Sequence, residues 1–120
     1  MVTRYASALL TIAGVLALLL GIVLWSGNGF NLVSMHMLLG LLAVIALCVI
    51  AVSQAVAKGG SWLLAGCALI VGLLTVVIGI KQAALMVGDR HWIVQVIHLV
   101  LGILTIGLGH LAAARAKRNG

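Results

Sequence analysis

The sequence predicts an all-α integral membrane protein: a four-transmembrane-helix bundle built from two tandem helical hairpins. The first observation is composition, since 65% of the 120 residues are hydrophobic, 7% are charged, and none is proline. A soluble domain of this size leaves too much of its chain exposed to hide so much apolar surface. The second is four apolar runs, each near the ~20 residues that cross a bilayer core. The third is an internal repeat that relates the two halves of the chain.

The four predicted helices cover residues 6–25, 32–56, 62–80 and 91–113, within one domain spanning residues 1–120. Glycine, serine, asparagine and charged residues fill the three connecting segments, as expected for loops. The apolar runs are long and lack the alternation of strands, and a helix satisfies its own backbone hydrogen bonds in lipid. We therefore expect helices in all four runs.

The basic residues predict the orientation in the membrane. With the N-terminus inside, Lys81 and Arg90 lie outside together with Asp89, the only acidic residue. The positive-inside rule then places both termini in the cytoplasm, in a plasma (cytoplasmic) membrane. Charge at the ends of apolar runs serves this purpose, and nucleic-acid binding is not expected. Five basic residues fall on the inner side: Arg4, Lys58, Arg115, Lys117 and Arg118.

A histidine followed four residues later by a glycine occurs on two of the predicted helices. His36 precedes Gly40, and His98 precedes Gly102, each within an apolar run. On a helix, such residues share one face. A shift of 62 residues superposes the two motifs, and a shift of 58 brings the preceding Gly21 onto Gly79. This pattern predicts a repeated hairpin with a pseudo-twofold axis along the membrane normal, and two histidines facing each other across it.

Ionisable side chains inside a membrane span are costly, so they are candidates for function. Neutral imidazole is a common axial ligand of heme iron. We therefore predict that His36 and His98 hold one heme b, and that nearby glycines leave room for its flat ring. Basic or polar residues near the predicted outer surface would bind the anionic propionates. The predicted cofactor-binding residues are Gly21, Gly40, Gly79, Arg90, His91, Gln95 and Gly102, with Lys81 as a further propionate partner.

Four helices with His-x-x-x-Gly on the second and fourth resemble the small membrane b-type cytochromes. Among these they resemble in particular the cytochrome b561 bundle and one half of the heme A synthase family. The resemblance implies a b-type heme held by His36 and His98. It departs from the first family, which carries a second histidine pair for a second heme, because residues 32–56 contain no histidine besides His36. It departs from the second because residues 26–31 contain neither an acid nor a cysteine pair, so heme-modifying activity is not implied.

Other readings stay open at this point. A histidine in a membrane helix also serves as an interhelical hydrogen-bonding group, and the chain then suits an accessory subunit of a larger respiratory or photosynthetic complex. A proton-coupled carrier is disfavoured because the chain has no glutamate and its one aspartate lies in a loop. No acid/base or nucleophile pair is visible, which favours a redox carrier over an enzyme.

The two remaining histidines, His91 and His110, lie near the ends of the last predicted helix. His91 is expected at the interface, beside a propionate or as an alternative ligand, and His110 at a solvated helix end without a second heme. Beyond the lipid bilayer, the expected partners are quinone or another redox protein, and a homo-oligomer is compatible with the sequence.

Overall fold

The structure is a computed structural model that describes residues 2–119, so the outermost residue at each end of the predicted domain lies outside it. Four α-helices make up almost all of this range, and each is long and apolar enough to span a membrane. The predicted fold class is confirmed, and the chain is a multi-pass membrane protein. The elements are α1 (Val2–Trp25), the 3₁₀ turn η1 (Phe30–Leu32), α2 (Val33–Val56), α3 (Trp62–Lys81), the 3₁₀ turn η2 (Gln82–Ala84) and α4 (His91–Asn119).

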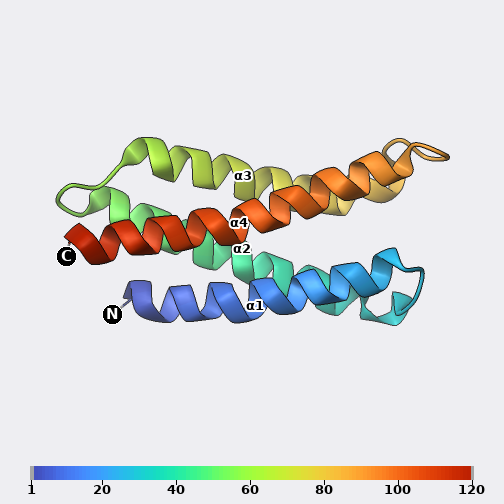
Figure 1. Cartoon of the computed structure of the whole chain (residues 1–120), viewed down its shortest axis with the longest axis horizontal. Coiled ribbons are helices and arrows are strands. Elements are labelled where there is room, and N and C mark those ends of the chain that lie inside the picture. Colours follow the sequence, from blue (N-terminus) through green and yellow to red (C-terminus); the bar gives the residue numbers. More distant parts are fainter. Residues whose placement is uncertain (1, 120) are drawn as a thin grey trace.

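The helices lie side by side in an elongated bundle of 49 × 23 × 15 Å, with both termini at one end (Figure 1). We call this the terminal end, and the other the opposite end. Helices α2 and α4 form the central pair: each contacts the other and also both α1 and α3. The two histidine motifs are on this central pair. Trp25 and Trp92 lie at the opposite end and Trp62 at the terminal end, all exposed as in an interfacial aromatic belt.

Two helices are longer than the apolar pattern predicted. Helix α1 begins at Val2 rather than near residue 6, and α4 continues to Asn119 rather than ending near residue 113. The extension of α4 is rich in alanine, arginine and lysine, which have high helix propensity in water. Apolarity therefore marked where the helices are expected to cross the bilayer and not where they end.

The main cluster of buried hydrophobic residues lies in the half of the bundle near the terminal end. Leu10, Leu47 and Ile50 are completely buried there. Alanines surround them and allow the helices to approach closely, because packing rather than water exclusion holds helices together in lipid. The alanines of this core are Ala13, Ala43, Ala46, Ala51, Ala55, Ala65, Ala68 and Ala112. No residue of this cluster lies beyond Ala43 toward the opposite end, where the site is found.

Glycines set the close contact of α1 with α4. A Cβ on Gly14 would lie 2.8 Å from Cγ1 of Ile106, and one on Gly109 would overlap Cδ2 of Leu10. Each helix therefore inserts an aliphatic side chain over a glycine of the other. This reciprocal contact fixes how α1 docks on α4.

The turn between α2 and α3 is closed by a buried glutamine. Gln54 is 1% exposed, and its amide donates to the carbonyls of Ala51 (3.0 Å) and Ser61 (2.7 Å). Its carbonyl oxygen accepts from the Ser61 backbone N–H at 3.1 Å. Gly59 has a φ of +76°, and a Cβ on Gly60 would overlap the carbonyls of Gln54 and Ala55. All polar groups of this side chain serve the turn, so Gln54 has a structural role.

Candidate functional site

A cavity of about 670 Å³ lies between the four helices in the half of the bundle near the opposite end. Its volume is in the range of small-molecule and cofactor sites. Every helix contributes to its wall, and the lining is mainly apolar with a few polar groups. The predicted site residues that line it are Gly21, His36, Gly40, Gly79, His91, Gln95, His98 and Gly102.

The imidazoles of His36 and His98 face each other inside this cavity. Their ring centroids are 6.2 Å apart and the ring planes are inclined by 73°. Both residues are half-buried. Helices α2 and α4 thus bring together two side chains that are 62 residues apart in sequence, at the same depth of the bundle.

The hydrogen bond of His36 fixes which of its nitrogens can act as a ligand. Its Nδ1 lies 2.8 Å from the backbone carbonyl of Ala17 on α1. A carbonyl only accepts, so Nδ1 must carry the proton that is donated. In the neutral imidazole, Nε2 then keeps a free lone pair. Metal-binding histidines commonly donate their other ring N–H to a backbone carbonyl in this way.

His98 stands in the equivalent position of the second hairpin. Its Nδ1 is buried and has no hydrogen-bond partner within residues 2–119, although the backbone of Thr75 lies beside it. Thr75 follows Ala17 by 58 residues, the same offset that relates Gly79 to Gly21. The two hairpins therefore present their histidines to the preceding helix in the same way. Only His36 forms the hydrogen bond from Nδ1 to the backbone carbonyl.

Two of the predicted glycines make room for the imidazoles. A Cβ on Gly21 would lie 3.1 Å from Cε1 of His36, and a Cβ on Gly79 would lie 2.8 Å from Cε1 of His98. The sequence predicts that all four glycines lie beside a cofactor ring. The structure assigns these two a different contact, since each supports one histidine ring from the neighbouring helix.

The other two glycines leave open space. A Cβ on Gly40 or Gly102 would meet no other atom within 4 Å, and both residues line the cavity. They lie one helical turn from His36 and His98, on the same faces of α2 and α4. The bare backbone at these positions extends the cavity beside the histidine pair.

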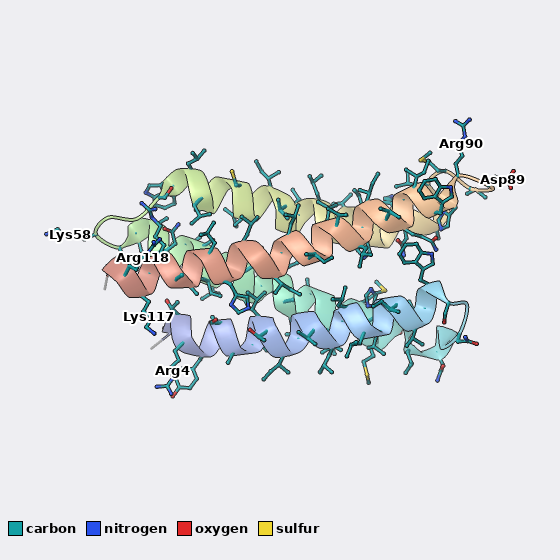
Figure 2. All side chains as sticks on the ribbon, viewed as in Figure 1. Arg4, Lys58, Asp89, Arg90, Lys117 and Arg118 are labelled. Carbon is teal, nitrogen blue, oxygen red and sulfur yellow. The ribbon has the colours of Figure 1, made fainter. Side chains whose placement is uncertain are left out.

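Polar residues reach the cavity toward the opposite end. Gln95 and His91, which lie one and two turns before His98 on α4, are both in its lining. His91 donates from Nδ1 to the Leu85 carbonyl at 3.0 Å, which holds the preceding loop and leaves Nε2 free. Arg90 and Lys81 are exposed and do not line the cavity. Figure 2 shows Arg90 pointing away from the helices, so of the predicted propionate partners the structure places only His91 and Gln95 at the cavity.

His110 lies far from this site, near the terminal end. It is exposed, as expected for a solvated helix end, and its Nε2 is 3.2 Å from Oγ1 of Thr11 on α1. It does not line the histidine cavity.

Sequence reasoning missed a hydroxyl pair that lines the cavity. Oγ1 of Thr75 on α3 and Oγ1 of Thr105 on α4 are 3.1 Å apart, and Thr105 is 3% exposed. In the sequence, each threonine lies among glycines at helical spacing, a pattern that indicates close helix packing but not which hydroxyls meet.

The donor set constrains what the site can bind. Within residues 2–119 there is no group of three or more histidine, cysteine, aspartate or glutamate side chains able to hold a metal ion. Zinc sites use three or four protein ligands. A heme needs fewer, because its porphyrin supplies four nitrogens and the protein adds only axial ligands. Two histidines therefore suffice for heme iron and are too few for a typical zinc site.

The spacing of the rings leaves room for one metal atom between the two imidazoles. A metal–imidazole bond is about 2 Å long and the ring nitrogen lies roughly 1 Å from its centroid, so two imidazoles on one metal have centroids roughly 6 Å apart. The observed separation is 6.2 Å. The open space beside Gly40 and Gly102 lies one helical turn from each histidine and belongs to the same cavity.

Comparison of the chain with protein-family models, curated proteins and solved structures found no match.

Proposed function

We propose that the protein binds one heme b per chain, with His36 and His98 as its two axial ligands, and acts in electron transfer. The observation that carries the proposal is the pair of facing imidazoles, with centroids 6.2 Å apart inside a cavity of about 670 Å³. The likeness to small membrane b-type cytochromes is consistent with this assignment, since it rests on the same two His-x-x-x-Gly motifs.

Different residues of the cavity would hold different parts of the cofactor. His36 and His98 would hold the heme iron, and Gly21 and Gly79 allow the imidazole rings to pack against α1 and α3. Gly40 and Gly102 leave the space that a ring needs. His91 and Gln95 lie where the anionic propionates of a heme would reach the surface, and their side chains can donate hydrogen bonds to carboxylates.

Ligation from both sides favours electron transfer over catalysis. A heme held by His36 and His98 would supply one-electron redox chemistry, and burial and hydrogen bonds to the histidines would tune its potential. A single heme in one half of the bundle does not bridge both surfaces. We therefore propose that the protein exchanges electrons at the opposite end, with quinone or with another redox protein.

The distribution of charge supports a location in the cytoplasmic membrane with both termini in the cytoplasm. The terminal end carries five of the seven lysines and arginines, and the opposite end carries Lys81, Arg90 and the lone acid Asp89 (Figure 2). The positive-inside rule assigns the more basic end to the cytoplasm. The heme site would then lie toward the outer face.

The test is the visible absorption spectrum of the detergent-purified protein, oxidised and then reduced with dithionite. We expect the sharp split bands of a low-spin b-type heme at about one heme per chain. A colourless protein that takes up no added heme would refute the proposal. The two histidines would then act as interhelical hydrogen-bonding groups in an accessory subunit.

A further inference from the structure

A second cavity lies between the first turns of α1 and the last turns of α4, at the terminal end. Its volume is about 790 Å³, and it is separate from the histidine cavity. Its polar lining comes from Thr3, Arg4 and Ser7 on α1 and from His110 and Lys117 on α4, and alanines of α4 form the rest. We call it the basic groove.

The positive charges of the basic groove have no counterpart in the described chain. Arg4 and Lys117 are exposed, and within residues 2–119 neither forms an ion pair or a side-chain hydrogen bond. The only acidic residue of the sequence, Asp89, lies at the opposite end (Figure 2). Because exposed like charges repel each other, an anion between them would be bound favourably.

Hydrogen-bond donors complete the groove. The hydroxyl of Thr11 donates to the carbonyl of Ser7 at 2.9 Å, which uses its only proton. The 3.2 Å contact of Thr11 with His110 must therefore have Nε2 of the imidazole as donor, and this bond ties α4 to α1 beneath the groove. The hydroxyls of Thr3 and Ser7 have no partner among the described residues, so they can donate to an anion.

An apolar surface continues from the groove toward the middle of the bundle. Gly107 and Ile103 lie one and two turns before His110 on the same face of α4, and both are exposed. Gly107 is bare, since a Cβ there would meet nothing within 4 Å. The groove thus joins a site for an anion to a strip that suits an alkyl chain.

We propose that the basic groove binds one anionic phospholipid, with its phosphate between Arg4 and Lys117 and one acyl chain along Gly107 and Ile103. Phosphate matches the charge-assisted hydrogen bonding of arginine and lysine. Anionic lipid is also the abundant anion at the cytoplasmic face of a membrane, where basic residues near the surface attract it. A zwitterionic lipid is disfavoured because its own ammonium group would meet the two cations.

The test is titration of the detergent-purified full chain with phosphatidylglycerol or with phosphatidylcholine of the same acyl chains, followed by native mass spectrometry. We expect the wild type to bind one phosphatidylglycerol at least tenfold more tightly than phosphatidylcholine. The Arg4→Ala/Lys117→Ala variant should lose roughly tenfold or more, as expected for removal of two lipid-facing cations. Arg4→Lys/Lys117→Arg should keep the preference for phosphatidylglycerol.

The matched control is Lys58→Ala/Arg118→Ala, which removes the same charge at the same end but from outside the groove. We expect this variant to bind within about twofold of wild type. An equal loss in the control would mean diffuse attraction and would overturn the proposal. Equal binding of both lipids by wild type, or the same thermal stabilisation by inorganic phosphate as by phosphatidylglycerol, would also overturn it.

Discussion

Substitutions at Gly40 and Gly102 can distinguish two roles of the histidine pair: binding a cofactor, or forming hydrogen bonds between helices. Both leave open space beside the imidazoles, and plain helix packing does not require that space. A leucine at either position has high helix propensity and meets no protein atom at its Cβ. It would fill the place of the ring while leaving the bundle intact.

We therefore predict that Gly40→Leu and Gly102→Leu each weaken heme binding at least tenfold, measured by titration with hemin, without lowering the melting temperature. The matched control is Gly66→Leu on α3, where an added Cβ also meets nothing but no cavity is lined. If Gly40→Leu bound heme as well as Gly66→Leu did, the ring would not lie beside this glycine.

Substitutions at Gly79 and Gly21 test whether these glycines hold the two imidazole rings in place. A methyl group on Gly79 would contact the His98 ring at 2.8 Å, closer than the 3.1 Å contact of Gly21 with His36. We predict that Gly79→Ala weakens hemin binding roughly tenfold, and Gly21→Ala less, because the displaced ring loses its alignment with the iron. The measurement is the fraction of high-spin heme in the absorption spectrum. An unchanged spectrum in Gly79→Ala would show that the ring moves freely.

At the scale of the helices, the contact between α1 and α4 depends on the glycine opposite Leu10. Leu10 is completely buried, so it cannot move aside for a methyl group on Gly109. We predict that Gly109→Ala lowers the free energy of unfolding by about 1–3 kcal/mol, as overpacking usually does. The measurement is denaturant unfolding in detergent followed by circular dichroism.

The control lies half a turn away on the same helix. Gly107→Ala adds a methyl group that meets no atom within 4 Å, and alanine favours a helix over glycine. It should leave the free energy of unfolding unchanged or raise it. Equal destabilisation by both substitutions would mean that the loss comes from α4 itself and not from its contact with α1.

The apolar runs were sufficient to predict the four helices, because length and hydropathy are what a bilayer selects. They did not predict the last turns of α4, which continue to Asn119 through an alanine-rich and basic segment. The repeat predicted that His36 and His98 face each other, because the two histidines occupy matching positions in the two hairpins.

Other features of the site had no signal in the sequence. The carbonyl of Ala17 orients His36, and a backbone carbonyl is present at every residue. The division of the four glycines into two that support imidazoles and two that open space depends on helix rotation. The direction of Arg90 also depends on a loop that carries no strong turn pattern (Figure 2).

At the scale of the whole molecule, the bundle divides into a packed half near the termini and a half with a cavity. The packed half holds the helices in place by alanine contacts and by the turn around Gln54. Two helical hairpins anchored at one end then surround the site at the other. This division allows a cavity of about 670 Å³ in a chain of only 120 residues.

The orientation of the whole bundle in the membrane can also be tested. Both termini lie at the basic end, so we predict that green fluorescent protein fused to the C-terminus fluoresces in bacterial cells (Figure 1). Alkaline phosphatase fused after residue 88 should be active, because the loop before α4 would lie outside. Activity of the phosphatase at the C-terminus instead would reverse the orientation and place the histidine cavity toward the cytoplasm.

The most direct test of the histidine pair is equilibrium titration of hemin into the purified wild type and into His36→Ala, His98→Ala and His110→Ala, read by absorption. With His36 and His98 as the two ligands, the wild type and His110→Ala take up one low-spin heme per chain. Each of the other variants loses the low-spin spectrum, because one axial nitrogen is missing. A normal six-coordinate spectrum in both His36→Ala and His98→Ala would contradict ligation by this pair.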